Sequence, residues 1–319
     1  MTELTTLLRC PETGGDLFWR AEDELGTEGA STYKVRNGIV HFLENPGAEQ
    51  APPNHNETQA FYEKQGWQAD EDGLFGDTKT FVDMRAVPLE HTRKSLKRLG
   101  KYFAKGGEVL LDAGSGPIAH DELLEYGEKF DKRICVDLSA QGLSVARGKL
   151  GEKGVYLQGD LTRLPLKDNS VDAVTCNHVL YQIPTALQIE AFKEIWRVLK
   201  PGGTAVIIYW WSHSPIEWRL EKLLEKFVRD PANGEAVYEA PEGEKPAHFP
   251  MSRHEFAAQD WPFDYELDVF RSVSNGFMKR FVSDDWRGRA FLGAFGLLHR
   301  IAPGFAGKYG AMPVIILRK

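Results

Sequence analysis

The chain has 319 residues, of which 42% are hydrophobic and 27% charged, a balance typical of globular proteins. No apolar run approaches the roughly 20 residues of a membrane-spanning helix, so we expect no membrane span. The net charge of −7 argues against a surface that binds nucleic acid through its phosphates. The acidic start lacks the basic and apolar parts of a secretory signal, and only three cysteines are present. We therefore expect a cytoplasmic protein.

Residues 1–48 predict a small β-rich module. Short β segments and glycine-containing turns alternate over 7–17 and 33–43. The segment that begins with Cys10 resembles a zinc ribbon, whose signature starts Cys-Pro-x-Cys, but Thr13 occupies the second cysteine position. No further Cys-x-x-Cys pair follows, so four metal ligands cannot be assembled. We interpret the module as metal-free, with a role in structure or recognition.

Residues 49–106 predict a helical segment that precedes the main domain and caps its substrate site. Pro52-Pro53 indicates the linker that leads into it. Over 87–103 the apolar residues recur near a helical period, and Gly106-Gly107 end this helix.

Residues 107–319 predict an α/β domain, because strands alternate with helices from 107 to about 211. We expect a doubly wound, mostly parallel, Rossmann-like sheet. The helix over 185–199 is stopped by Pro201-Gly202-Gly203 before the fifth strand. The five strands are predicted over 108–112, 133–137, 155–158, 171–176 and 204–210, with a helix over 140–150.

The chain departs from this alternation after residue 211. A charged helix over 215–228 and a loop rich in Pro and Gly over 230–250 indicate a helical lid insert at about 212–262. A long strand is predicted over 263–274 and a terminal strand over 314–317. We expect the terminal strand to add to the sheet in the antiparallel direction, as part of a β-hairpin.

The most informative motif for function is Leu110-Leu111-Asp112-Ala113-Gly114-Ser115-Gly116. A strand ends in an acid, and a Gly-x-Gly turn follows. Glycine lets the backbone approach a ligand where a Cβ would clash, and the carboxyl ends of parallel strands are where such sheets bind nucleotides. Alone, the turn is equally compatible with a purely structural role.

Further acids follow the next two strands. Asp137 ends the second strand, about 20 residues after the turn, and Asp160 follows the third. Together with the turn and the sequence Lys200-Pro201-Gly202-Gly203 before the fifth strand, they resemble the class I methyltransferases that use S-adenosylmethionine (SAM). The resemblance covers about 107–209. It implies these cofactor-binding residues: Asp112 and Gly114 at the amino-acid end of SAM, Gly116 in the turn, Asp137 at the ribose, Asp160 with Leu161 at the adenine, and in addition Leu138 and Asn177.

A nicotinamide-dependent dehydrogenase is the alternative for this fold. Gly114-x-Gly116-x-x-Ala119 satisfies the dinucleotide fingerprint, and Asp137 suits either ligand. Asp112 suits the ammonium group of SAM but would repel a pyrophosphate, and Asp160 suits adenine recognition. These acids and the antiparallel terminal strand favour the methyltransferase.

Methyl transfer needs alignment of the acceptor with the methyl group and, for a weakly acidic acceptor, a general base. His178 is predicted as the base or as a group that orients the substrate, and Tyr181 as a lining residue. A packing role for His178 at a loop is the alternative. His213 and then His120 are further candidates. No Asp/Glu/His set has metal-ligand spacing, so we expect no metal.

The leading functional hypothesis is methyl transfer to a small organic molecule, such as a natural-product, glycan, or lipid or quinone-type intermediate. Aromatic residues at 61–67, at 81–85 and in the insert are expected to contact this substrate or to form the core of the lid. The alternatives are an RNA methyltransferase, because zinc-bearing relatives of the N-terminal module occur on such enzymes, and a non-catalytic SAM-fold binding protein. The sequence makes no prediction of oligomeric state.

Overall fold

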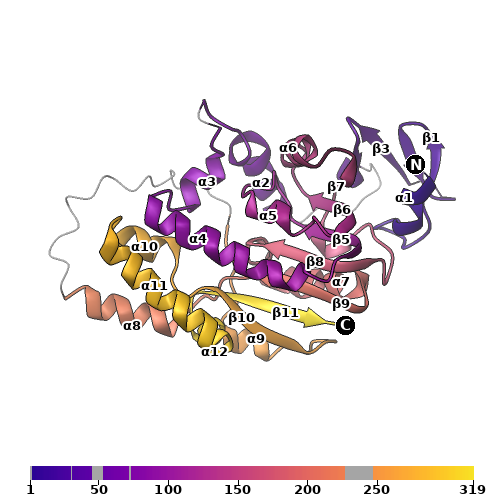
Figure 1. The fold of residues 1–319 in the computed structure, drawn as a ribbon. Coiled ribbons are helices and arrows are strands. Elements are labelled where there is room, and N and C mark those ends of the chain that lie inside the picture. The colour runs from indigo at the N-terminus through magenta and orange to yellow at the C-terminus, as the bar shows by residue number, and fades with distance from the viewer. Residues whose placement is uncertain (1, 30, 45–52, 72, 227–246) are drawn as a thin grey trace.

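The computed structural model describes residues 2–29, 31–44, 53–71, 73–226 and 247–319. Within them, eleven strands join in one sheet with the order β1-β2-β3-β4-β7-β6-β5-β8-β9-β11-β10 (Figure 1). The strands are β1 (Phe18–Ala21), β2 (Glu24–Gly26), β3 (Thr32–Arg36), β4 (Ile39–His41), β5 (Gly107–Ala113), β6 (Phe130–Asp137), β7 (Gly154–Gln158), β8 (Val171–Asn177), β9 (Leu199–Ile208), β10 (Tyr265–Arg271) and β11 (Met312–Arg318).

Helices cover both faces of this sheet. The α-helices are α1 (Thr2–Leu7), α2 (Pro53–Phe61), α3 (Gly76–Phe81), α4 (Ala86–Leu99), α5 (Glu122–Glu125), α6 (Ala140–Leu150), α7 (Thr185–Val198), α8 (Pro215–Leu224), α9 (Arg253–Ala257), α10 (Asn275–Phe281), α11 (Trp286–Ile301) and α12 (Pro303–Tyr309). A π-helical turn, η2 (Tyr62–Gly66), follows α2. The 3₁₀ turns are η1 (Phe42–Glu44), η3 (Gly100–Phe103), η4 (Gly151–Lys153), η5 (Leu161–Arg163) and η6 (Leu180–Gln182).

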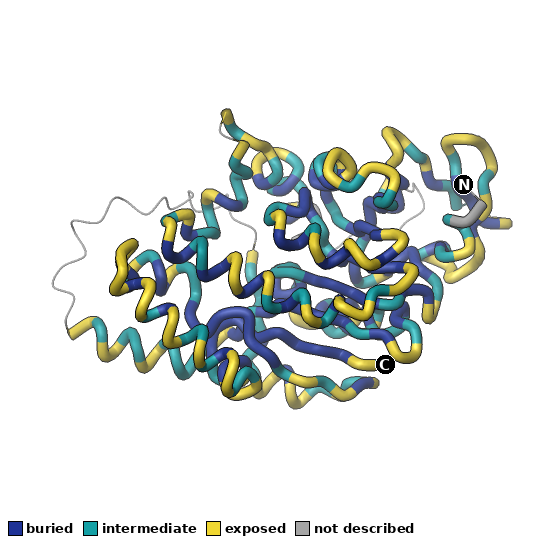
Figure 2. The backbone as a smooth tube through the Cα atoms, in the orientation of Figure 1, coloured by how far each residue is buried: buried dark blue, intermediate teal, exposed yellow. Residues whose placement is uncertain are grey.

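The five predicted central strands are confirmed, and β7, β6, β5, β8 and β9 run parallel to one another. Neighbouring residues of β5 point to opposite faces, as a strand requires. Leu111 packs in a core with Phe192 of α7, whereas Leu110 packs with Leu99 of α4 and Leu143 of α6. The buried parts of the chain follow the strands in Figure 2, so the sheet is doubly wound as expected.

The C-terminal part confirms the antiparallel addition but not the β-hairpin. β11 pairs antiparallel with β9, and β10 pairs antiparallel with β11. Three helices, α10, α11 and α12, connect β10 to β11, so the two strands are not joined by a tight turn. The helix predicted over 215–228 ends as α8 at Leu224. The last two residues of that prediction, and residues 230–246 of the predicted loop, lie outside the described residues.

The helix predicted over 185–199 is confirmed as α7, which ends at Val198, but Pro201-Gly202-Gly203 lie within β9 and not before it. The register between β8 and β9 shifts here, from Val171 opposite Leu199 to Ala173 opposite Thr204. Gly202 adopts a φ of +82°, a conformation typical of such a bulge. The Gly202 N–H donates to the Lys319 carbonyl at 2.6 Å, so Lys319 supplies the hydrogen-bond acceptor that this irregular segment needs.

The N-terminal strands extend the main sheet. β4 pairs parallel with β7 through Ile39, Val40 and His41, and the β1–β3 ribbon continues outward from it. The Cys10 thiol is buried and lies 3.0 Å from the Tyr33 hydroxyl. No cluster of metal-ligand side chains occurs among the described residues. The predicted boundary between the N-terminal module and the helical segment, near residue 48, lies outside the described residues. Pro52 of the predicted linker lies outside them too.

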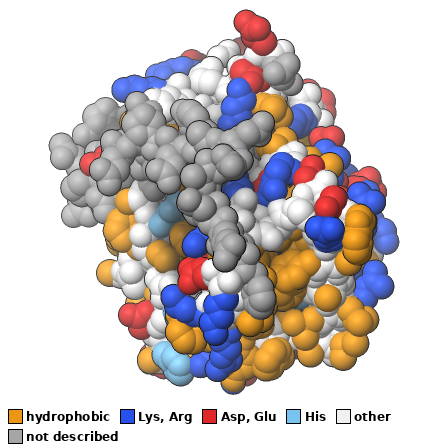
Figure 3. Space-filling model, turned by 90° about the vertical axis from the view of Figure 1, so that its left-hand side faces the viewer, with side chains coloured by type: hydrophobic (Ala, Val, Ile, Leu, Met, Phe, Trp, Pro, Cys, Tyr) orange, Lys and Arg blue, Asp and Glu red, His pale blue; other side chains and the backbone are white. Residues whose placement is uncertain are grey.

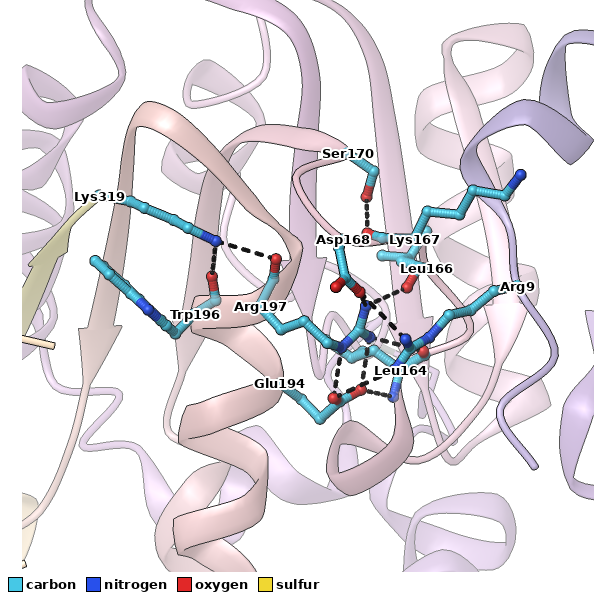
Figure 4. A network of polar contacts seen from close by, with 10 residues as sticks. All are labelled: Arg9, Leu164, Leu166, Lys167, Asp168, Ser170, Glu194, Trp196, Arg197 and Lys319. Carbon is cyan, nitrogen blue, oxygen red and sulfur yellow. Dashed lines mark hydrogen bonds and ion pairs between the residues drawn. The ribbon is translucent and has the colours of Figure 1, made fainter. Parts of the chain in front are cut away.

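A polar network fixes the start of the chain to the domain (Figure 4). Arg9 and Arg197 both donate to the Asp168 carboxylate, at 3.1 and 2.8 Å. Glu194 accepts from Arg197 at 2.6 Å and from the Leu164 N–H at 2.8 Å. The network joins the N-terminal segment, the loop between β7 and β8, and α7.

The C-terminal helices and α8 pack around a small core of their own that includes Phe277 and Leu292. Their outer sides expose large apolar residues, and Figure 3 shows hydrophobic side chains gathered on this side of the molecule. None of the helices in the described ranges has the length and apolarity to cross a bilayer. The exposed apolar residues of these helices are Trp218, Leu223, Trp286, Leu297, Ile301 and Phe305.

Candidate active site

A cavity of about 550 Å³ opens at the carboxyl ends of β5, β6 and β8. Its size is within the ~300–1,000 Å³ of ligand-binding pockets. The cap formed by α2, η2 and α3 bounds one side, and the end of β10 with the start of α10 bounds another. It is lined by the predicted residues Asp112, Gly114, Asp137, Leu138, Asp160, Leu161, Asn177, His178, Tyr181 and His120.

The glycine turn has the conformation that only glycine adopts easily. Gly114 has a φ of +72°, and a Cβ at this position would collide with the side chain of Val179. Gly116 has a φ of +48° and donates its N–H to the Asp137 carboxylate at 2.8 Å. Gly116 faces the indole of Trp67 and does not line the cavity, which matches its predicted role in shaping the turn.

Asp137 lies at the end of β6 and is held by two backbone groups. Besides the Gly116 N–H, its carboxylate accepts from the Ser139 N–H at 2.8 Å. Burial raises the pKa of this carboxyl to about 6, although both hydrogen bonds oppose the shift. The carboxylate is thereby fixed at the predicted ribose position.

Asp112 forms a buried ion pair that the sequence reasoning missed. Arg133, on the neighbouring strand β6, donates to Asp112 Oδ2 at 3.1 Å from Nε and at 2.5 Å from Nη2. Arg133 is 0% exposed and Asp112 2%. Both bonds go to Oδ2, which leaves Oδ1 for a ligand. The sequence did contain a signal for this pair. Arg133 lies in a predicted buried strand, where a charged side chain requires a partner of opposite charge.

The predicted adenine and methionine ends also carry polar groups. Asp160 caps η5 by accepting from the Thr162 N–H at 2.8 Å, and η5 begins with Leu161, which lines the cavity. Asn177 donates to the Thr175 hydroxyl at 3.0 Å, while its Oδ1 is buried and has no hydrogen-bond partner within the described part of the chain. A buried acceptor without a donor is costly, so a ligand N–H group would fit there. These groups suit the amino group of adenine and the ammonium group of SAM.

The cap docks directly on the cofactor side of the site. Glu63 of η2 accepts hydrogen bonds from the N–H groups of Ala140 and Gln141, at 2.6 and 3.2 Å, at the start of α6. Trp67 stacks on Tyr62 with ring centroids 4.7 Å apart and packs against Gly116. The predicted helical segment therefore closes one wall of the cavity.

Among the predicted catalytic residues, His178 and Tyr181 lie together in the cavity. His178 has a φ of +62°, and its ring packs 5.1 Å from that of Phe270. Burial, and then the nearby Arg271 charge, lower the pKa of His178 to about 3, so it is neutral at pH 7. Burial raises the pKa of Tyr181 well above its ordinary value, which leaves a neutral phenol. His213 is exposed and lies outside the cavity, so the geometry gives it no role.

Asp77 is a further acid of the cavity that the sequence did not single out. It lies on α3, and the Tyr62 hydroxyl is 3.3 Å from its Oδ1 and 3.1 Å from Gln182 Oε1. Burial raises the pKa of Asp77 from 3.8 to about 7. No local sequence motif identifies Asp77, because it lines the cavity only through the tertiary packing of the cap.

Comparison with known proteins agrees with this geometry. Residues 111–207 match a family model described as a methyltransferase domain. The chain is 37% identical over 121 residues to a demethylmenaquinone methyltransferase from Lactococcus lactis, covering 36% of this chain and 46% of the relative. It is 28% identical over 169 residues to a ubiquinone/menaquinone biosynthesis C-methyltransferase from Legionella pneumophila, covering 49% of this chain and 66% of the relative. The chain thus spans about half to two thirds of these relatives.

Among solved structures, a SAM-dependent methyltransferase from Archaeoglobus fulgidus is similar at 19% identity and a TM-score of 0.42, covering 72% of this chain and 94% of the other. The strand order, rather than this superposition, defines the fold. The glycine turn, the acids after β5, β6 and β7, and the matched family model lead to one assignment. Residues 111–207 form a methyltransferase domain, and their strand order and glycine turn are those expected of the class I enzymes whose methyl donor is SAM.

Proposed function

We propose that this protein transfers a methyl group from SAM to a small organic molecule. The observation that carries the proposal is one continuous cavity. Its cofactor end is lined by Asp112, Gly114 and Asp137, and its other end by side chains of the cap and of the β10–α10 segment. Such a cavity accommodates a donor and an acceptor side by side, which is the main requirement of an in-line transfer.

When bound, SAM supplies a methyl group already activated by its sulfonium. The residues of this chain have the tasks of binding, alignment and exclusion of water. The Asp137 carboxylate and Asn177 Oδ1 hold hydroxyl and ammonium groups of the donor, and the cap closes over them through Glu63. His178, neutral and held between Phe270 and Tyr181, orients the acceptor by a hydrogen bond.

Asp77 is the proposed proton acceptor. Its carboxyl pKa of about 7 matches what a general base requires near neutral pH. A pKa of about 3 leaves His178 little tendency to take a proton, so orientation of the acceptor is its proposed role. The Tyr62 hydroxyl, between Asp77 and Gln182, fixes the position of the base.

Several aromatic side chains line the acceptor end, which favours an acceptor with an apolar or ring-shaped body over a glycan. Tyr181 packs edge-on against Trp210 and His248, at 5.7 and 5.5 Å between ring centroids. The names of the two relatives add quinone-type intermediates to the acceptors to be tested. The net charge of −7 counts against RNA.

Two measurements test the function. Calorimetry with SAM, S-adenosylhomocysteine and NAD(P) should show heat only with the first two; binding of NAD(P) alone would favour the dehydrogenase. Incubation with labelled SAM should then transfer label to a small-molecule fraction of a cell extract and not to its RNA fraction. Label in RNA would favour the RNA methyltransferase, and binding without any transfer would favour a non-catalytic protein.

A further inference from the structure

Besides Arg133, the chain buries a second arginine, Arg271, and this one lines the cavity. Arg271 ends β10, is 2% exposed, and lines the cavity beside Phe270. A guanidinium removed from water is costly unless an opposite charge compensates it. Elsewhere the chain supplies that charge, since Arg133 pairs with Asp112 and Arg98 with Asp268, at 2.5 and 3.1 Å.

Arg271 has only neutral partners. Its Nη1 donates to Thr92 Oγ1 at 3.0 Å and to Asn275 Oδ1 at 2.7 Å, and its Nη2 lies 3.1 Å from Met312 Sδ. Its Nε is buried and has no hydrogen-bond partner in the described ranges. Across those same ranges, no carboxylate oxygen lies within 4.0 Å of the guanidinium. Within the described part of the chain, the charge is therefore held without a counter-ion.

The acids whose charge reaches Arg271 are bound to other groups. Glu217 accepts from the Ser274 N–H and hydroxyl, at 2.6 and 2.7 Å. Asp83 pairs with Arg85 at 2.6 Å. Burial lowers the pKa of Arg271 to about 10, so the side chain still carries its charge at neutral pH. A buried cation in this state would be stabilised by an anionic ligand.

We propose that Arg271 binds a carboxylate or phosphate group of the methyl acceptor. Nη1 uses both of its N–H groups on Thr92 and Asn275, so Nε and Nη2 present the fork of N–H groups that such oxyanions accept. The body of the acceptor then lies against aromatic walls, which come from Phe81, Tyr181, Trp210 and Phe270. This inference rests on the proposed function. It implies an acceptor that is an organic acid or a phosphate ester, because a neutral quinone would leave Arg271 uncompensated.

The probes are benzoate, phenyl phosphate and neutral benzamide, each titrated with and without S-adenosylhomocysteine. The two anions should bind at least about tenfold more tightly than benzamide, the smallest effect expected of a charge-assisted pair. The tighter of the two anions identifies the class of acceptor. Equal binding of all three probes, with or without S-adenosylhomocysteine, overturns the proposal.

Variants separate recognition from structure. Arg271→Met should abolish the preference for anions and Arg271→Lys should retain part of it, while the affinity for S-adenosylhomocysteine stays unchanged in both. Because Arg271→Met removes an uncompensated buried charge, its Tm should be equal or higher; a lower Tm with the anion preference intact would make Arg271 structural. If Arg271→Met does not fold, Arg271→Lys and the wild type decide. Lack of S-adenosylhomocysteine binding in the wild type would instead refute the proposed function.

Discussion

The Glu63 carboxylate accepts a hydrogen bond from the backbone N–H of Ala140, the first residue of α6, at 2.6 Å. A residue of the cap thus occupies the helix end that lies beside Asp137. The free N–H groups and the dipole of a helix N-terminus favour a carboxylate there. The bond ties the cap to the wall of the cofactor end.

We expect Glu63→Ala to loosen this cap. The loss of the two N–H···carboxylate bonds should lower the free energy of unfolding by about 1 kcal/mol, as for other helix caps. The affinity for S-adenosylhomocysteine should fall several-fold, measured by calorimetry. Gln65→Ala, at an exposed position of the same turn, is the matched control and should change neither quantity. Equal effects of both substitutions would contradict a specific role for Glu63.

Gly114→Ala should abolish binding of S-adenosylhomocysteine. The φ of +72° disfavours alanine, and the added Cβ would meet the Val179 side chain. Gly148→Ala is the control, because Gly148 lies in α6 with no atom within 4 Å of an added Cβ. That substitution should raise the free energy of unfolding by about 0.5–1 kcal/mol through helix propensity. Unimpaired binding by a folded Gly114→Ala protein would place the cofactor elsewhere.

The pH dependence of the reaction should report Asp77. A base acts in its deprotonated form, so with a pKa of about 7 the value of kcat/KM should rise through neutral pH and level off above it. Asp77→Asn should lower kcat/KM by about 10²–10⁴-fold and remove this rise. An unchanged profile in a weakly affected variant would refute Asp77 as the base.

The Asp77 carboxyl should make the free energy of unfolding fall as pH rises, whereas most acids, with lowered pKa values, make it rise. The folded protein keeps a proton that an unfolded chain, with the ordinary pKa of 3.8, has released. The Asp77 contribution to the free energy of unfolding should therefore decrease as pH rises from about 4 to about 7. Asp77→Asn should lack this decrease, which denaturant titrations at several pH values would detect.

His178→Ala should reduce turnover while the affinity for S-adenosylhomocysteine survives. A group that orients the acceptor affects the reaction and not the donor site. Because the pKa of His178 is about 3, the pH profile above pH 5 should keep its shape. Unchanged turnover would assign His178 a packing role against Phe270.

The sequence predicted the central strands well because they carry continuous apolar runs and end in recognisable turns and acids. It failed where distant residues complete a local structure. The Pro201-Gly202-Gly203 segment continues β9 because Lys319 bonds to it. α11 was missed because apolar residues such as Leu297 and Ile301 are exposed, which obscures the helical period of its buried side.

In the site, the residues that follow strands could be predicted, since parallel strands bring their carboxyl ends together. Glu63 and Asp77 could not, because they precede the domain by many residues and reach it only through packing of the cap. Arg271 lies in a strand that the pattern predicts, but only the surroundings of its side chain show that no described carboxylate pairs with it.

The position of β4 beside β7 has a consequence for truncated forms of the protein. Without the first 44 residues, the backbone groups of Tyr156, Leu157 and Gln158 that face β4 would be left open along an apolar strand. Such an edge is a template for strands of other molecules. A shortened protein should therefore self-associate into sheet-rich aggregates even if its donor site is intact. In the full chain, β4 covers this edge of β7 and prevents such pairing.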